Sequence, residues 1–422
     1  MKRKKLMLGL VSGLMTGVLL AGCGPQESGA DGSESEKSNK LVIWEDKEKA
    51  IGIEDAVAEF EKEHDVTVEI IEKNYAQQLE DLRLDGPGGS GPDVFTMPGD
   101  QMGSAVTEGL VKEIAVDEAL QSTYTESAMQ SQIVDGKVYG LPKAVETTML
   151  YYNKDLITEE ELPQDLEGWF NYSKEVRKGE QYGFLAQFDQ TYYANSVLSG
   201  YGGYVFGKNG DGTFNPEDIG LNNEGSVEGA NEIKRFYDEK IFPAGMVGEQ
   251  GINVIESLFT EGKAAAIISG PWNLEPFESA GVDYGIASLP KLSNGENMRA
   301  FIGVKSYNVS TFSKNAELAE ELVKYLSNEE VSKVRYEKTK EVPAVKALAE
   351  DQEVMESDAS KAIAEQSQFS DLTPGIPEMN EVWKPTDAAL QTIATGKSEP
   401  QEALDQAVKS IEGQIEANHG GK

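Results

Sequence analysis

The stretch Lys40-Leu41-Val42-Ile43-Trp44 decides the fold class, because it is a short run rich in β-branched and aromatic residues at the start of the foldable part of the chain. Apolar residues then recur at Ile53, Val57 and Phe60, which is the spacing of one helix face. A second β-rich run follows at 66–70. The sequence therefore predicts a strand, a helix and a second strand, the repeating unit of an α/β sheet.

The same alternation continues beyond this unit. The run 93–97 is another buried-strand candidate, introduced by a glycine-rich turn at 86–91 and followed by a predicted helix through Ala105 and Leu110. Later strand candidates are 140–142, 149–152, 264–268 and 284–287, and helices are expected over 316–327, 329–339 and 400–416. Such alternation indicates a parallel sheet with helices on both faces. Because the roughly 380 residues after the N-terminal region exceed what one core usually holds, we expect two α/β lobes with helical additions.

The N-terminal region indicates export and lipid anchoring. Four basic residues at 2–5 precede the apolar run 6–20, which is too short to span a hydrocarbon core of about 30 Å. The following Leu20-Ala21-Gly22-Cys23 resembles the lipobox of bacterial lipoproteins, in which the cysteine is lipidated and becomes the new N-terminus. A plain secretory signal or an uncleaved anchor is the alternative. Residues 24–39 carry no large apolar side chain and are expected to form a flexible tether, so we predict a protein anchored on the extracytoplasmic face of the cell membrane.

Charge and motif content exclude several functions. Loss of residues 1–22 removes four cationic residues and changes the formal charge from −35 to −39, which disfavours nucleic-acid binding. The only histidines, His64 and His419, lie in a charged surface run and in a glycine-flanked tail, and Cys23 is the only cysteine. The G-x-S-x-G elbow and the Walker phosphate loop are absent. We therefore predict no metal site and no cofactor.

Aromatic residues on predicted loops indicate a stacking surface. Trp272 follows a strand and a Gly-Pro turn, Trp383 follows a proline-rich turn, and Tyr192 and Tyr193 lie in a polar loop. Each of them fits core packing as well. Together they suit sugars, whose C–H patches pack on aromatic faces while their hydroxyl groups bond to fixed carboxylates and amides. Asp100 and Glu146 are candidate acceptors, although Glu146 also fits a solvated loop.

An ordered set of motifs resembles bacterial maltose and maltodextrin-binding proteins over residues 40–416. The motifs are 40–44, Gly91-Pro92-Asp93-Val94-Phe95, Ala144-Val145-Glu146, 150–156, Gly270-Pro271-Trp272 and 376–383. The family consists of solute-binding components of carbohydrate ABC importers. The resemblance implies a two-lobed α/β fold of the periplasmic-binding-protein type II class that closes over a sugar by hinge bending, and binding rather than catalysis.

The resemblance also assigns site residues. Trp272 and Trp383 match stacking tryptophans, Tyr192 matches a stacking tyrosine, and Asp100 and Glu146 match carboxylates that bind sugar hydroxyls. Further expected ligand-binding residues are Tyr193, Gln190, Met97, Gln101, Met379, Asp46, Lys47 and Glu48. Met97, Gln101 and Gln190 stand where better-known members carry tryptophan, arginine and glutamate, which leaves the preferred chain length open.

The resemblance finally implies a domain layout and partners. The first lobe is expected at 40–144 and 302–340, the second at 149–300 and 345–417, and the hinge near 145–148, 301 and 341–344. Maltodextrins, the membrane permease of an ABC importer and a monomeric state are the partner predictions. The alternatives are a different oligosaccharide, a chemosensory or adhesive role, and a lipid-anchored glycoside hydrolase that uses Glu146 and Asp100.

Overall fold

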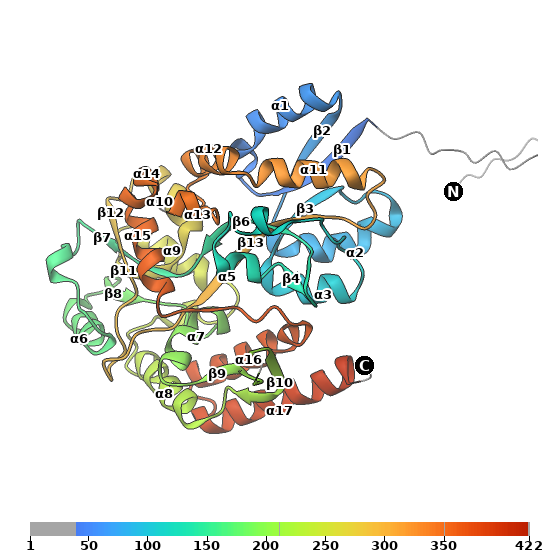
Figure 1. Cartoon of the computed structure of the whole chain (residues 1–422). Helices are drawn as coiled ribbons and strands as arrows, with labels where there is room; N and C mark the ends of the chain where they lie inside the picture. The colour runs from blue at the N-terminus through green and yellow to red at the C-terminus, as the bar shows by residue number, and fades with distance from the viewer. Residues whose placement is uncertain (1–38, 211, 350, 421–422) are drawn as a thin grey trace, which may run out of the picture. The chain divides into compact units, whose positions relative to one another are not determined.

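Two mixed β-sheets organise the part of the chain that this computed structural model describes, namely residues 39–210, 212–349 and 351–420 (Figure 1). Cys23, the predicted signal and nearly all of the predicted tether lie outside these residues. No helix within the described ranges is long and apolar enough to cross a membrane.

The first sheet contains the predicted β-α-β unit. Its strand order is β14-β13-β3-β1-β2, and β6 also pairs with β13. The strands are β1 (Lys40–Asp46), β2 (Thr67–Lys73), β3 (Val94–Pro98), β6 (Leu141–Glu146), β13 (Phe301–Val309) and β14 (Asp371–Leu372). β1 is parallel to β2 and β3, with Lys40 opposite Thr67 and Ile43 opposite Val94. β13 runs antiparallel to β3 and β6. This sheet and its helices are called the first lobe below.

The second sheet has the order β12-β7-β11-β8. Its strands are β7 (Met149–Asn153), β8 (Tyr182–Leu185), β11 (Ala264–Ser269) and β12 (Tyr284–Ala287). Every residue of β7 and β11 is buried, as expected for strands covered on both faces. This sheet, with the helices packed on it, is the second lobe. Two short hairpins complete the described strands, β4 (Ile133–Val134) with β5 (Lys137–Val138) and β9 (Tyr204–Lys208) with β10 (Phe214–Gly220).

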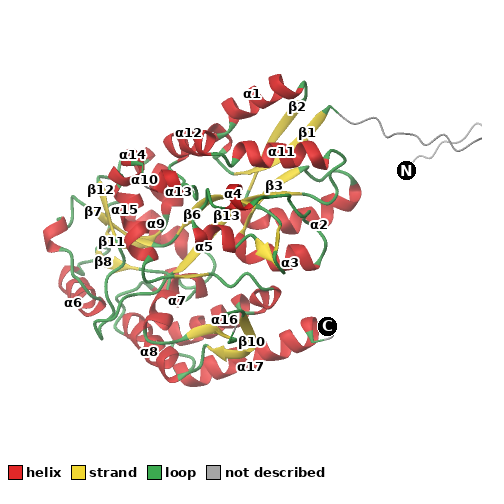
Figure 2. Ribbon diagram, viewed as in Figure 1, coloured by secondary structure: helices red, strands yellow, loops and turns green. Residues whose placement is uncertain are grey.

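Helices pack against both sheets (Figure 2). They are α1 (Glu54–His64), α2 (Gln78–Gly88), α3 (Met102–Thr107), α4 (Glu118–Gln121), α5 (Glu126–Gln130), α6 (Leu166–Val176), α7 (Thr191–Gly200), α8 (Glu224–Asp238), α9 (Gly251–Thr260), α10 (Leu274–Ser279), α11 (Ala316–Leu326), α12 (Glu329–Thr339), α13 (Lys346–Ala349), α14 (Gln352–Glu356), α15 (Asp358–Ser367), α16 (Trp383–Ala394) and α17 (Pro400–His419). The helices expected near 316–327, 329–339 and 400–416 are confirmed as α11, α12 and α17.

The chain passes between the lobes on strands that lie side by side. β6 leads into β7 after two residues, and β13 returns to the first sheet beside β6, with Gly303 opposite Glu146. Later, Leu348 packs in the first lobe's core and Ala359 in that of the second. The lobe and hinge boundaries given above stay a prediction.

Four local predictions are wrong. Tyr192 and Tyr193, expected in a polar loop, lie in the helix α7. The sheets are mixed rather than parallel, because β7 and β13 run against their neighbours. The helix α2 continues through the expected turn to Gly88, since buried Gly86 packs against Phe312, and it ends at Gly89 with φ of +77°. The helix α3 stops at Thr107, before Leu110, because Gly109 adopts φ of +69°.

Candidate functional site

Four aromatic side chains meet near the start of β13 and form what we call the aromatic row: Trp272, Tyr192, Phe301 and Trp383. The ring centroid of Tyr192 lies 6.2 Å from that of Trp272 and 6.3 Å from that of Phe301. Phe301 in turn lies 5.9 Å from Trp383. Because Tyr192, Trp272 and Trp383 are only half-buried, part of each ring remains accessible. The structure thus brings together the three stacking candidates expected from the sequence.

The loop that carries Trp272 is held tightly at the carboxyl end of β11. Gly270 allows the indole to fold back over the backbone, since a Cβ atom there would lie 2.2 Å from the Trp272 ring. The hydroxyl group of Tyr151 donates to the Gly270 carbonyl at 2.8 Å. On the other side, the Asn273 amide donates to Ser269 Oγ at 2.7 Å. These contacts hold the loop on both sides of Trp272.

Tyr192 stands at the start of α7, which is fastened to α16. The backbone N–H and hydroxyl of Thr191 donate to Asp387 Oδ1 at 2.7 and 2.6 Å, and Asp387 lies one turn beyond Trp383. The Tyr192 hydroxyl is buried and has no hydrogen-bond partner within the described residues. A buried hydroxyl without a hydrogen-bond partner costs about 1–3 kcal/mol. A ligand that forms a hydrogen bond with this group would remove that cost.

Glu146 lies at the end of β6 and is held through both of its oxygens. Its Oε1 accepts a hydrogen bond from the Tyr75 hydroxyl at 2.8 Å, and its Oε2 lies 3.3 Å from Lys305 Nζ. The cavity that Glu146 lines with Trp272, Lys305 and neighbouring residues has a volume of only about 10 Å³. A ligand at Glu146 therefore requires the lobes to separate or side chains to move.

Asp100 supplies a second carboxylate near Glu146. It lies in the 3-10 helix Gly99–Gln101, directly after β3, and is half-buried. Burial, followed by the negative charge of Glu146, raises the pKa of Asp100 to about 6.

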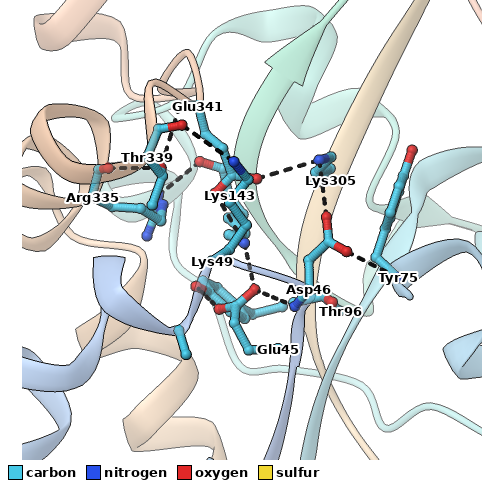
Figure 3. Close-up of polar contacts among 12 residues, drawn as sticks. Glu45, Asp46, Lys49, Tyr75, Thr96, Lys143, Lys305, Arg335, Thr339 and Glu341 are labelled. Atoms are coloured by element: carbon cyan, nitrogen blue, oxygen red, sulfur yellow. Dashed lines mark hydrogen bonds and ion pairs between the residues drawn. The ribbon is translucent and has the colours of Figure 1, made fainter. Parts of the chain in front are cut away.

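Glu146 belongs to a buried ion-pair network, and Figure 3 shows the lysines at its centre. Lys143 Nζ lies 2.5 Å from Glu45 Oε1 and 3.1 Å from Glu341 Oε2. Lys305 Nζ lies 3.3 Å from each of Asp46, Glu146 and Glu341. The two lysines thus join the end of β1, the strands β6 and β13, and the segment after α12.

The charges in this network stabilise one another. Burial alone would lower the pKa of Lys305, but the negative charges of Glu146 and Glu341 outweigh it and raise the pKa well above the ordinary value. Burial would raise the pKa of Glu341, but the charges of Lys143 and Lys305 hold it below its ordinary range. Lys305 and Glu341 are therefore both charged at neutral pH.

Several other candidates lie in the cores. Met97 is fully buried among Trp44, Leu82 and Phe95. Met379 is fully buried beneath Trp383 and Tyr192, and Tyr193 packs in the core of the second lobe. None of these three presents an open face in this structure, although Met379 and Tyr193 support the aromatic row from below.

The remaining candidates are divided between the rim and the surface. Asp46 is buried and pairs with Lys305. Gln101 is half-buried, with an Oε1 atom that is buried without a partner in the described structure, and Gln190 is half-buried at the N-cap of α7. Lys47 and Glu48 have exposed side chains just beyond β1.

Sequence reasoning missed Tyr75, Lys143, Lys305, Glu341 and Phe301. Lys143 lies between apolar residues of β6, and Lys305 directly follows the apolar run 301–304 of β13, which signals a buried charge that needs partners. Tyr75 follows directly after β2, where open α/β sheets place ligand contacts. Phe301 and Glu341 carried no comparable local signal.

The two histidines are engaged elsewhere. His64 stacks on Phe60 at 4.0 Å and pairs with Glu321, and His419 contacts Glu381 at 3.1 Å. The site itself offers aromatic faces, carboxylate acceptors and tyrosine hydroxyl groups. This combination suits the binding of a polyhydroxylated, uncharged molecule.

Known proteins are similar to this chain in sequence and in fold. Residues 55–363 match the family model described as bacterial extracellular solute-binding protein. A galactooligosaccharide-binding protein of Bacillus subtilis (strain 168) is 66% identical over 403 residues, 96% of this chain and 96% of the relative. A maltooligosaccharide ABC transporter solute-binding lipoprotein of Streptococcus pneumoniae (strain ATCC BAA-255 / R6) is 34% identical over 423 residues, 98% of this chain and 97% of the relative.

A solved structure shows the same fold. The crystal structure of MalX from Streptococcus pneumoniae in complex with maltopentaose matches with a TM-score of 0.82 and 33% sequence identity, covering 89% of this chain and 100% of that chain. The two sheets described above are thus the two lobes of a periplasmic-binding-protein fold. The chain belongs to the bacterial extracellular solute-binding proteins.

Proposed function

We propose that this protein binds uncharged oligosaccharides between its lobes, with galactooligosaccharides preferred, and delivers them to the permease of an ABC importer. The observation that carries the proposal is the aromatic row beside Glu146 and Asp100, with the unpaired Tyr192 hydroxyl among them. Aromatic faces pack against the C–H patches of pyranose rings, and carboxylates accept hydrogen bonds from ring hydroxyls. Binding, without bond cleavage, is the proposed activity.

The charge of the site favours neutral sugars over acidic ones. Lys305, the cation that contacts Glu146, also faces Asp46 and Glu341, so its charge is already compensated. A uronate or phosphosugar would bring a further negative charge toward Glu146 and Asp100. Because like charges repel most strongly in a partly buried site, acidic oligosaccharides are excluded.

The sugar preference rests on similarity. The relative with 66% identity is named for galactooligosaccharides, whereas the more distant relative and the solved structure are named for maltooligosaccharides and maltopentaose. Chains of β-1,4-galactose and of α-1,4-glucose both have one axial bond at each linkage and both curve. One curved cleft therefore suits either chain, and maltodextrins are the second candidate.

Calorimetry and intrinsic tryptophan fluorescence of residues 24–422 test the proposal. The panel consists of β-1,4-galactobiose to galactotetraose, maltose to maltotetraose, cellotriose as a straight-chain control and digalacturonate as an acidic control. We expect saturable binding of the galactose series, weaker binding of maltodextrins, and no binding of digalacturonate. Chromatography of the sugar after the titration checks that it is unchanged. If none of the neutral oligosaccharides bound, the proposed function would be wrong.

Closure brings α3 of the first lobe against the 3-10 helix Pro377–Glu381. The Asn380 amide donates to Ser104 Oγ at 2.6 Å. Gly103 approaches so closely that a Cβ atom would lie 2.5 Å from the Gly375 carbonyl oxygen. We propose that this contact forms when the lobes close, and a side chain at position 103 would obstruct it.

Replacing Gly103 with alanine is expected to weaken oligosaccharide binding about tenfold, or about 1.4 kcal/mol, by opposing closure. Alanine has the higher helix propensity, so the open form should remain stably folded. Small-angle scattering with saturating sugar would show a larger radius of gyration than the wild type. Gly88→Ala is the matched control, because a Cβ atom there has one neighbour at 3.8 Å. Equal affinity in both variants would contradict the proposed closure contact.

The pKa of Asp100 gives the binding a pH dependence. An ionised Asp100 accepts strong hydrogen bonds from sugar hydroxyls through both oxygens, and protonation below its pKa of about 6 removes the charge and turns one acceptor into a donor. Affinity is expected to fall about tenfold as the pH drops from 7.5 to 5. Burial also raises the pKa of Asp189 to about 6, so Asp100→Asn is needed to assign the effect. If Asp100→Asn kept the pH dependence of the wild type, Asp100 would not be the cause of that dependence.

Lipidation at Cys23 would hold the protein on the outer face of the membrane near the permease, as the lipoprotein name of a relative suggests. We further propose that it acts as a monomer. Detergent phase partitioning of the full chain and of Cys23→Ser tests the anchor, and light scattering tests the monomer.

A further inference from the structure

Tyr75 is placed by its backbone at the carboxyl end of β2 in the first lobe. It opens the 3-10 helix Tyr75–Gln77, and Asn74 caps this turn by accepting a hydrogen bond from the Ala76 N–H. The Tyr75 N–H donates to Asp46 Oδ1 at 3.2 Å, as Figure 3 shows. The backbone of Tyr75 is therefore held beside the buried ion-pair network.

The side chain of Tyr75 contacts both the Glu146 carboxylate and its counter-ion, Lys305. Its hydroxyl donates to Glu146 Oε1 at 2.8 Å. Lys305 Nζ lies 4.5 Å from the centroid of the Tyr75 ring and 3.3 Å from Glu146 Oε2. Tyr75 and Lys305 thus hold the two oxygens of Glu146 separately, and the position of the carboxylate is set by three elements.

Two tyrosine hydroxyl groups from opposite lobes flank Glu146. Burial, followed by the charge of Glu146, raises the pKa of both Tyr75 and Tyr192 well above the ordinary value, so both keep their protons. The Tyr75 oxygen still has acceptor capacity after donating to Glu146. The Tyr192 hydroxyl has no partner within the described residues. A sugar hydroxyl placed here would meet donors and acceptors from both lobes.

We propose that Tyr75 is a ligand-contacting residue of the oligosaccharide site and that its hydroxyl group sets which sugar is preferred. This inference rests on the proposed function. The ring alone would stack on any pyranose, because stacking does not depend on hydroxyl configuration. A site that hydrogen-bonds one particular hydroxyl rejects a sugar that presents it differently. Tyr75 comes from the first lobe, so its contribution requires closure.

The alternative is that Tyr75 is purely structural, and Tyr307 provides a matched control. The Tyr307 hydroxyl also donates to a carboxylate of the same network, Glu45, at 2.8 Å, but Tyr307 is fully buried. Tyr75→Phe and Tyr307→Phe each remove one such hydroxyl. A structural role predicts the same result for both variants, namely lower thermal stability and an unchanged sugar preference.

The test is calorimetry of both variants with β-1,4-galactotriose, maltotriose and cellotriose. In Tyr75→Phe we expect the best-bound trisaccharide to weaken at least fivefold while the next changes less than twofold. In Tyr307→Phe we expect the ratio of the two affinities to stay as in the wild type. An unchanged ratio in Tyr75→Phe would overturn the inference and leave the proposed function intact. Failure of the wild type to bind any of the three would overturn both.

Discussion

Replacing Lys143 with methionine is expected to lower the free energy of unfolding by about 3–5 kcal/mol, because it leaves the buried Glu45 carboxylate without a counter-ion and Glu341 with Lys305 alone. Lys143 is fully buried, and its Nζ lies 2.5 Å from Glu45 Oε1 and 3.1 Å from Glu341 Oε2. Methionine has a similar length and no charge, so packing is largely kept. Urea unfolding followed by circular dichroism, without sugar, measures the change.

Two further variants separate charge from packing. Glu45→Gln combined with Lys143→Met removes one buried charge of each sign and is expected to recover part of the lost stability. Lys137→Met breaks an exposed ion pair with Glu113 and is expected to leave the unfolding midpoint unchanged. A loss below about 1 kcal/mol in Lys143→Met would contradict the view that this network stabilises the fold.

Local pattern was sufficient to predict much of the fold. Runs such as 40–44 and 264–268 are short and mainly apolar and became the buried strands β1 and β11. Strand direction was not predictable in the same way, because it depends on how the chain returns between lobes rather than on the composition of a strand. The prediction of a turn at Gly86 was wrong for a similar reason, since Gly86 contacts Phe312, which lies more than 200 residues away in the sequence.

The positions of the candidate site residues were predictable where those residues follow a strand end. Asp100 and Trp272 lie just after the ends of β3 and β11, and Tyr192 lies after the loop that follows β8. The structure places all three near Glu146. Met97 was misplaced because alternation along β3 directs it into the core. Lys143 and Lys305 were overlooked because their role appears only when β1, β6 and β13 are assembled, which brings Glu45, Asp46 and Glu146 around them.

Replacing Trp272 with alanine is expected to weaken binding of the best-bound oligosaccharide at least a hundredfold, or about 3 kcal/mol. The indole is half-buried at the carboxyl end of β11, is fixed over Gly270 and packs against Tyr192. Its loss removes one stacking face and frees the neighbouring Tyr192 ring to move. Calorimetry at pH 7.5, where Asp100 is ionised, measures the loss.

Trp169→Phe is the matched control for this variant. Trp169 is fully buried in the core of the second lobe, 5.5 Å from Phe184, and lies on α6 rather than on a strand-end loop. Its replacement is expected to lower the unfolding midpoint while leaving the dissociation constant within about twofold of the wild type. Trp272→Ala should show the opposite pattern, a lost affinity with a nearly unchanged midpoint. If both variants lost affinity in proportion to their stability, the aromatic row would be a packing feature of the second lobe and not a sugar platform.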